Sequence, residues 1–268
     1  MKISIVTSYY NRKKQFINTL ETISKSSEIN NTEIIAVDDA SDDSERIEYL
    51  TNLYPFLKVI RVNKENKWWS NPSIPFNKAI NESSGDVIIL QNPECLHLGD
   101  ILKNAKENIN DTNYLSYSVY SINHTTTNKL SNLKYDENLF NQINEIIGQK
   151  NNVGFTGIGQ ECWYNHPIYR PCYYHFISAI SRKNINILGG FDERYGYGCS
   201  YDDDEFLHRV KLLGLDLKII DEVHGVHQWH NTYENRDFEF HNKELKNRDL
   251  FNNITKKLKS PEIKNQIL

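Results

Sequence analysis

The first hundred residues alternate between short apolar runs and longer amphipathic stretches. Four runs are rich in isoleucine and valine and too short for helices: residues 2–8, 32–39, 57–62 and 86–92. Such runs are typical of parallel strands that are buried on both faces. Helical patterns lie between them, with apolar residues on one face: Phe16, Leu20 and Ile23 in one, and Ile47, Leu50 and Tyr54 in another. The alternation predicts βαβ units, an α/β fold and a mainly parallel sheet flanked by helices.

In an open sheet of this kind, ligands bind beyond the carboxyl ends of the strands. The polar residues that end the strands should converge there, and they are Ser8 to Arg12, Asp38 and Asp39, and Asn92 to Glu94. The carboxylates of Asp38 and Asp39 are placed to accept hydrogen bonds from the base and ribose of a nucleoside. The alternative is that they cap the next helix, which is the favoured interpretation for Asp42 and Asp43.

The sequence of the turn after the first strand bears on how a diphosphate could be bound. The stretch TSYYNRKKQ contains no glycine, which disfavours a glycine-rich phosphate loop and a dinucleotide-binding dehydrogenase. A metal ion is the usual alternative for diphosphate charge. Asn92 and Glu94, separated by a stiffening proline, carry oxygens suited to Mg²⁺ or Mn²⁺, although a plain strand-ending turn explains them as well.

Composition narrows the function classes only slightly. The chain has 268 residues, a net charge of −4 and 25% charged residues, which is ordinary for a globular protein and disfavours nucleic-acid binding. Its N-terminus lacks the apolar run of a signal peptide or membrane span, so a cytoplasmic location without a transmembrane segment is expected. Four scattered cysteines form no close pair, which argues against a zinc knuckle or redox motif.

Residues 202–205 place four carboxylates in a row before an apolar-periodic stretch. At a helix N-terminus the macrodipole and the unpaired N–H groups offset part of their mutual repulsion. Crowding of like charges raises the pKa of at least one of them, which suits a base for a sugar hydroxyl. The alternative is that these residues simply begin a solvated helix.

Several motifs occur in an order that resembles the nucleotide-sugar glycosyltransferases of the GT-A fold. They are IVTSYYNR, AVDDASDD, a strand ending where an Asp-x-Asp motif would be expected, LGGFDERYGYG and DDDEFLHR. The likeness covers residues 1 to about 230 and is greatest to family 2 and to the β-1,4-galactosyltransferase type. It implies a GT-A fold and an inverting transfer of a hexose (galactose, glucose or N-acetylglucosamine) from a UDP-sugar to a glycan or glycoconjugate.

The resemblance also implies roles for individual residues. Asp203 matches the general base, and Asp202 matches a residue that binds acceptor hydroxyls. The metal ligands would be Glu94, His227 and His230, a mixed set more compatible with Mn²⁺ than with Mg²⁺. The acceptor would contact Trp163, Tyr197, Gly198 and Asp202. The nucleotide-sugar would contact Thr7, Ser8, Tyr9, Asn11, Arg12, Asp38, Asp39, Phe76, Asn77, Lys78, Gln91 and Asn92.

A second hypothesis for the function and the expected domain boundaries complete these expectations. Asn92 and Glu94 depart from the usual Asp-x-Asp, so a sugar-nucleotide or glycan-binding protein without turnover is the second hypothesis. The glycosyltransferase domain is expected over residues 1–235, with a nucleotide-sugar half (1–95) and an acceptor half (96–235). Residues 236–268 should form a helical tail. It is expected to pack on the domain as a solvated helix, and the alternatives are a homodimer contact or a membrane-surface contact.

Overall fold

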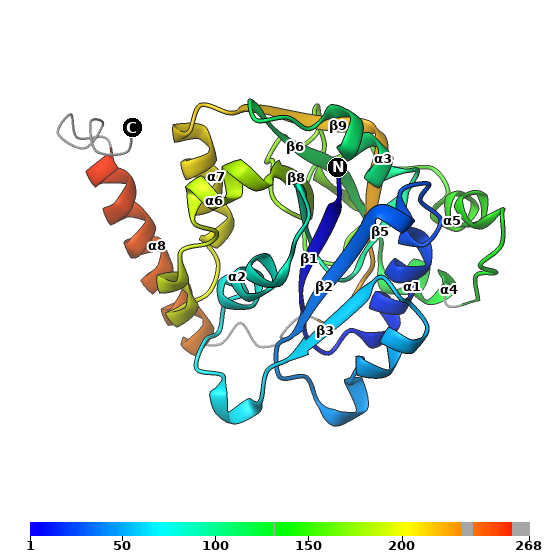
Figure 1. Ribbon diagram of the computed structural model, residues 1–268, viewed down its shortest axis with the longest axis horizontal. Helices are drawn as coiled ribbons and strands as arrows, with labels where there is room; N and C mark the ends of the chain where they lie inside the picture. Colours follow the sequence, from blue (N-terminus) through cyan, green and yellow to red (C-terminus); the bar gives the residue numbers. More distant parts are fainter. Residues whose placement is uncertain (131, 232–237, 259–268) are drawn as a thin grey trace.

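The four strands predicted in the first hundred residues are all present. The computed structural model describes residues 1–130, 132–231 and 238–258. The four strands are β1 (Ile3–Tyr9), β2 (Thr32–Asp38), β3 (Leu57–Arg61) and β4 (Val87–Gln91). They pair in parallel in the order β3-β2-β1-β4, with β1 between β2 and β4 (Figure 1).

The sheet continues beyond β4 with mixed strand directions. The strands are β8 (Ile177–Ser181), β6 (Asn113–Ser121), β9 (Asp216–His227), β5 (Cys95–Leu98) and β7 (Cys162–Asn165). β8 lies antiparallel between β4 and β6, β9 runs parallel to β6, and β5 and β7 pair antiparallel with β9 and β6. The mixed half therefore brings the end of β9 next to the turn that follows β4.

Helices cover both faces of the sheet. On one face, α1 (Lys13–Ile23) and α3 (Ile101–Asn108) bury residues such as Phe16 and Leu20 against the strands. On the other face, α2 (Ser73–Glu82), α6 (Arg182–Leu188) and α7 (Asp202–Leu212) do the same with Phe76 and Phe206. Each buried side chain of this size stabilises the fold by roughly 1.5–3 kcal/mol.

The helix predicted around residues 47–54 is wrong in type. The structure has two short 3-10 segments there, η2 (Asp43–Glu45) and η3 (Glu48–Asn52). Ile47, Leu50 and Tyr54 are nevertheless buried, because the i to i+3 hydrogen bonds of such turns also bring residues three and four apart to one side. The spacing of these apolar residues therefore indicates burial, but it does not distinguish an α-helix from 3-10 turns.

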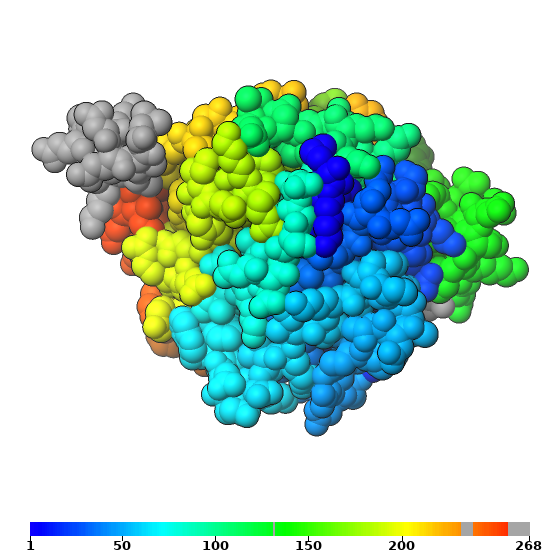
Figure 2. All heavy atoms as spheres, viewed as in Figure 1, coloured from blue at the N-terminus to red at the C-terminus, as the bar shows by residue number. Residues whose placement is uncertain are grey.

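Three helices lie at the outside of the molecule. α4 (His124–Leu130) and α5 (Leu139–Ile147) cover the β6–β9 side, and α8 (Phe238–Leu258) runs along α7 and the 3-10 segment η5 (Glu193–Tyr197). Figures 1 and 2 show α8, in orange to red, at the opposite end of the molecule from α5. The expected domain boundary at residue 235 and tail residues 259–268 lie outside the described residues. Within the described part of the chain, no helix has the length and apolar character needed to cross a membrane.

Candidate active site

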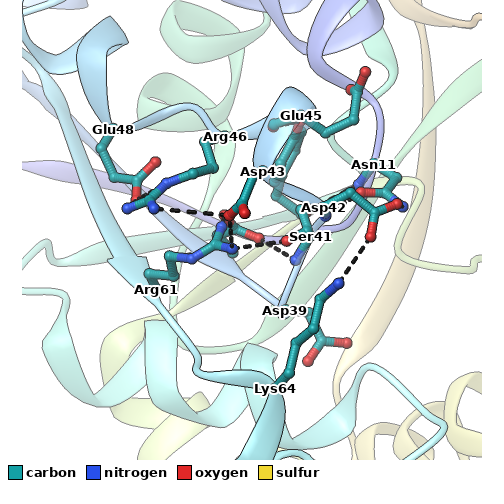
Figure 3. Close-up of polar contacts among 12 residues, drawn as sticks. Asn11, Asp39, Ser41, Asp42, Asp43, Glu45, Arg46, Glu48, Arg61 and Lys64 are labelled. Carbon is teal, nitrogen blue, oxygen red and sulfur yellow. Dashed lines mark hydrogen bonds and ion pairs between the residues drawn. The ribbon is translucent and has the colours of Figure 1, made fainter.

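The carboxyl ends of β1 and β2 meet at one edge of the sheet, as the sequence predicts. Asp39 N donates to the Tyr9 carbonyl over 2.8 Å. Asn11, in the left-handed region with φ 49°, exchanges two hydrogen bonds with Asp42, each 2.9 Å long. Figure 3 shows Lys64 reaching the other oxygen of Asp42 from the segment after β3. Asn11 and Asp42 therefore fasten the two strand-end turns together.

Asp38 and Asp39 have different surroundings. Asp38 is fully buried, accepts from Ser41 N, and has its other oxygen 2.5 Å from Arg61 Nη1. Asp39 accepts from Lys67 Nζ and from Trp69 Nε1, each over 2.8 Å. Burial raises the pKa of Asp39, and these two donors only partly oppose that effect. The structure thus assigns Asp38 to the framework of the turn, and Asp39 is the carboxylate whose partners border a pocket.

The end of β1 divides its side chains between core and site. Thr7 and Tyr9 share the face covered by α1, and both are buried. The Tyr9 hydroxyl donates to the Glu45 carbonyl over 2.6 Å, and its ring packs on Phe16. This placement corrects the expectation that the Tyr9 side chain contacts the nucleotide. Ser8, on the opposite face of the strand, is only half-buried.

A pocket of about 450 Å³ opens beside Asp39. Its walls come from three segments: Lys67 to Pro72, Cys199 to Asp202, and Glu239 to Lys243. The two partners of Asp39, Lys67 and Trp69, lie on one wall, and Asp202 lies on another. The residues that hold Asp39 and the acidic start of α7 therefore border the same pocket, although more than 130 residues separate Lys67 from Asp202 in the chain.

The four adjacent carboxylates of α7 point in different directions. Asp202 is buried and accepts from Asn71 Nδ2 over 2.8 Å, and burial together with the neighbouring Asp203 raises its pKa to about 6. Asp204 accepts from the Tyr174 hydroxyl over 2.8 Å. Glu205 forms a bidentate pair with Arg209, one turn along the helix. Successive residues of a helix are rotated by about 100°, so each acid has its own partner and the row is tolerated.

Of Asp202 and Asp203, which begin α7, Asp203 is the more accessible carboxylate. Its side chain is 37% exposed, and its Oδ1 lies 2.6 Å from Nδ1 of the buried His175. His175 precedes Phe176, whose ring is 6.2 Å from that of His227, and Asn92 N donates to the Phe176 carbonyl. The segment 175–176 therefore separates Asp203 on one side from the turn after β4 on the other.

A second polar group sits in that turn. Glu94 is fully buried, and its Oε1 lies 3.1 Å from His227 Nε2 and 3.4 Å from His230 Nε2. Its other oxygen pairs with Arg12 Nη1 at 2.9 Å. β9 ends at His227, and the turn that follows brings His230 back to the same carboxylate. His224 lies elsewhere, against Lys150 and Trp163.

The chemistry of Glu94, His227 and His230 fits a divalent metal ion. One ligand atom from each residue lies within 4.8 Å of the others. Burial alone would raise the pKa of Glu94, but Arg12 and the two histidines outweigh it and hold the pKa well below its usual range. Burial lowers the pKa of His227, so the carboxylate is ionised and this imidazole is neutral, as metal ligands must be. The mixed oxygen and nitrogen donors suit Mn²⁺ and related ions.

Gln91 and Asn92 flank this group without belonging to it. Gln91 is buried, donates to the Cys95 carbonyl over 2.9 Å and lies 2.9 Å from His97 Nε2. It therefore holds the tight turn 91–95 closed, and its predicted contact with the donor has no support in this placement. Asn92 begins the turn and is half-buried.

The segment Phe76–Asn77–Lys78, expected to contact UDP, lies on α2. Phe76 is buried and stacks on Phe191, and Asn77 exchanges hydrogen bonds with the main chain of Phe191. Lys78 lies on the exposed face, where its charge adds to that of Lys58 in lowering the pKa of Glu82. The structure therefore turns Lys78 away from the site, because it is one residue out of phase with the buried face of the helix.

The predicted acceptor residues are also separated. Trp163 is 6% exposed and packs against Tyr120, on the face of β7 opposite to Tyr164, so it belongs to the core. Tyr197 is 58% exposed, and its ring centroid is 4.5 Å from that of Trp68. Gly198 packs against Asn247 of α8. Of the two aromatic residues selected from the sequence, only Tyr197 presents a surface.

Four residues of the site were missed from the sequence: Lys67, Trp69, Asn71 and His175. Three of them lie in the irregular stretch KENKWWSNP, which offers no periodicity. His175 directly precedes a predicted strand, and nothing in its spacing marks it as a partner of Asp203.

Comparison with known proteins supports the same family from two directions. The model of glycosyl transferase family 2 matches residues 4–173, more than half of the chain. A dolichol-phosphate mannosyltransferase of Pyrococcus furiosus is 32% identical over 111 residues, which are 41% of this chain and 30% of that protein. The matched model ends before α7, so Asp202 and Asp203 lie outside it.

Solved structures extend the likeness to the rest of the chain. TarS of S. aureus, in complex with UDP-GlcNAc, matches with a TM-score of 0.59 and 16% identity, over 87% of this chain and 60% of that one. The mannosyltransferase PcManGT of Pyrobaculum calidifontis, in complex with GDP-Man and Mn²⁺, matches with a TM-score of 0.56 and 16% identity, over 99% and 68%. The GT-A fold expected from the sequence is thus confirmed. The chain spans about a third of the length of the Pyrococcus relative and 60% of TarS.

Proposed function

The chain belongs to glycosyl transferase family 2, and from that premise we propose that it is an inverting glycosyltransferase. It moves a hexose from a UDP-sugar to a hydroxyl of a glycan or glycoconjugate. One observation supports this best: the accessible carboxylate of Asp203 and the Glu94–His227 group lie on either side of residues 175–176. A base for the acceptor hydroxyl and a cation site for the leaving diphosphate are the two groups that this displacement uses.

The donor is proposed to lie along the carboxyl ends of β1, β2 and β4. Ser8 and Asp39 border the nucleoside, and Lys67 and Trp69 hold the Asp39 carboxylate in place. Arg12, anchored by Glu94, supplies positive charge for the diphosphate. Solved neighbours bind UDP, UDP-GlcNAc and GDP-Man. UDP-galactose, UDP-glucose and UDP-N-acetylglucosamine are the proposed donors for this chain.

Glu94, His227 and His230 are proposed to hold Mn²⁺, with Mg²⁺ as the second candidate. A bound divalent ion would offset the negative charge that develops on the leaving diphosphate. Glu94 is kept ionised by its neighbours, and the segment after β9 aims both imidazole rings at it. These residues therefore need no rearrangement to present their ligand atoms.

The acceptor is proposed to bind over Tyr197 and Trp68, next to the acidic start of α7. Both rings are more than half exposed and lie in contact, and aromatic faces of this kind pack well against sugar rings. Asp202 borders the neighbouring pocket and is placed to bind an acceptor hydroxyl. Which sugar and which linkage are formed depends on contacts to individual hydroxyls.

In the proposed reaction, the acceptor oxygen attacks the anomeric carbon from the face opposite to the diphosphate. Asp203 takes the proton of that hydroxyl as the new carbon–oxygen bond forms. The bond between the anomeric carbon and the diphosphate oxygen breaks, and the nucleoside diphosphate leaves with the bonding electron pair. One displacement inverts the configuration and needs no covalent intermediate.

The test is release of UDP from a panel of UDP-, GDP- and dTDP-sugars in the presence of Mn²⁺. We expect UDP-sugars to be turned over, and Asp203→Asn to lower kcat by about 10²–10⁴-fold, the usual contribution of a general base. UDP binding should be unchanged in this variant, because Asp203 lies away from the nucleoside. Full activity of Asp203→Asn would contradict the assigned base, and a preference for GDP-sugars would contradict the assigned donor.

The second candidate is a nucleotide-sugar or glycan-binding protein that has lost turnover. The Arg12–Glu94 ion pair favours it, since a guanidinium already neutralises the carboxylate that a metal would use. Tight UDP binding without release of UDP from any donor, in wild-type protein supplied with Mn²⁺, would establish this alternative. NMR of a sugar product separates inversion from retention.

A further inference from the structure

A buried histidine is in direct contact with the proposed base. His175 Nδ1 lies 2.6 Å from Asp203 Oδ1, and the histidine side chain is 6% exposed whereas that of Asp203 is 37% exposed. The contact therefore joins a ring fixed inside the protein to a carboxylate that reaches the solvent. One oxygen of Asp203 is committed to His175, and the exposed part of the side chain leaves the other oxygen accessible to solvent.

The ring of His175 is held by aromatic residues from three parts of the fold. Its centroid lies 5.1 Å from that of Phe76 on α2, 5.0 Å from that of Phe191 and 6.5 Å from that of Phe206 on α7, each edge to face. Phe191 and Phe206 also stack on each other at 4.6 Å. Packing of this kind fixes the rotamer of the imidazole, so His175 presents Nδ1 to Asp203 in one direction.

The charges around His175 are predominantly acidic. Burial alone would lower the pKa of His175, but Asp203, helped by Asp202, outweighs burial and raises it. The titratable groups that face this pair from the elements around it are Asp202 and Asp204 on α7, Tyr114 on β6, and Cys172 and Tyr174 before β8. None of these is a lysine or an arginine. The acidic surroundings of His175 thus favour its charged form.

We propose that His175 is a positioning residue for the transfer reaction: it binds Oδ1 of Asp203 and thereby aims Oδ2 at the acceptor hydroxyl. The proton of the hydroxyl goes to Oδ2, and none is transferred to His175. This inference rests on the proposed function, in which Asp203 is the base. It goes further because it names the residue that selects Asp203, and not Asp202, as the base.

Different results are expected if His175 has a purely structural role and only packs against the neighbouring phenylalanine rings. Loss of the ring would then lower stability and donor binding together, and the pH profile of the remaining activity would keep its shape. A positioning role affects kcat more than KM. It also moves the acid limb of the profile to higher pH, because loss of a positively charged neighbour disfavours the ionised form of a carboxylate.

The experiment compares His175→Gln and His175→Phe with wild type in the full chain. His241→Gln, an exposed histidine of α8, is the matched control. UDP release from UDP-galactose, UDP-glucose or UDP-N-acetylglucosamine with Mn²⁺ is measured from pH 5 to 9, and UDP affinity is measured by calorimetry. We expect kcat at pH 7 to fall about tenfold or more in both variants, UDP affinity to change less than twofold, and the acid limb to move up by about one pH unit.

A second measurement needs no turnover. Nitrogen-15 NMR of the histidine side chains should show that His175 titrates at higher pH than His241, and that Asp203→Asn removes this difference. If Asp203→Asn kept full UDP release, the proposed function itself would fail. If Asp203→Asn were inactive while folded His175→Gln kept the wild-type kcat and pH profile, only the role of His175 would be overturned. His175 titrating like His241 would overturn it too.

Discussion

Adjacent residues of this protein have different roles because their side chains enter different surroundings. Asp38 is paired with Arg61 inside the turn, and Asp39 is held by Lys67, which borders the pocket. Asp202 is buried against Asn71, and Asp203 is half-exposed beside His175. In both acidic pairs one residue supports the structure around the other. Two acidic residues that are adjacent in the chain can therefore differ in burial, in partners and in role.

Asp202 gives a testable pH dependence. Its pKa of about 6 in the folded protein lies above the ordinary value of about 4, so folding favours the neutral form. The resulting stabilisation is fully present below pH 4 and is lost as the pH rises through 6. Because the group is coupled to Asp203, we expect a contribution on the order of 1–3 kcal/mol to the free energy of unfolding.

Urea unfolding of wild type and Asp202→Asn at pH 5 and pH 7.5 measures the contribution of Asp202 to the free energy of unfolding. Asparagine keeps an oxygen for Asn71 and cannot ionise, so the variant should gain stability relative to wild type at pH 7.5. Titrations common to both proteins cancel in the difference. An equal difference between the two proteins at both pH values would show that Asp202 does not titrate in this range.

Side chains of α2 and α8 join these helices to other parts of the fold. Asn77 of α2 binds the main chain of Phe191, and Asn247 of α8 donates to the carbonyls of Tyr195 and Ser200. These contacts hold the loop 189–200, which leads into α7. Asn77, which the resemblance places at the nucleotide-sugar, also binds the segment that leads to the helix carrying the acids.

Gly190 tests this arrangement, with Gly189 as a matched control. Both have positive φ, +74° and +71°, but a Cβ at Gly190 would overlap Asn77 Oδ1 whereas one at Gly189 would meet nothing. Gly189→Ala should cost about 1–2 kcal/mol of unfolding free energy from backbone strain. Gly190→Ala should cost about 1–3 kcal/mol more, because the partly buried hydrogen bonds between Asn77 and Phe191 are displaced. Equal losses in urea unfolding would show that Asn77 adapts.

At the scale of the whole molecule, the site is assembled from both halves of the sheet. The parallel half supplies Ser8, Asp39 and the turn at Glu94, and the mixed half supplies His175 and His227. Pairing of β5 with β9 places Cys95 opposite His227, which puts Glu94 and the histidines in reach of each other. A ligand that binds across the two halves should therefore stabilise the entire fold.

Thermal unfolding checks this linkage. A donor nucleotide at 100 times its Kd stabilises by about 2.7 kcal/mol, and for a chain of this size we expect UDP with Mn²⁺ to raise Tm by roughly 5–10 °C. Removing the metal with EDTA, or replacing Glu94 with glutamine, should remove most of that shift. Glu107→Gln, on the exposed face of α3, should keep it. An unchanged shift in Glu94→Gln would argue against Glu94 as a metal ligand.

Particular residues show how far the sequence could lead. The strands of the first half were predicted within one or two residues, since buried parallel strands have a strong apolar signal. Glu94, His227 and His230 were grouped from a resemblance, and the structure brings them together. Tyr9, Lys78 and Trp163 were placed at the site, but each lies on the opposite face of its strand or helix. A rotation by one residue is enough to move a side chain between site and core.

The sequence by itself determined the alternation of strands and helices, the edge where polar residues gather and the family to which the chain belongs. These follow from local periodicity and from motifs that are read in order along the chain. Only the tertiary structure decided which acid of each pair is accessible, which histidines share a carboxylate and which residue faces Asp203. Such contacts join positions far apart in the chain, and burial and charge act through space and not along the sequence.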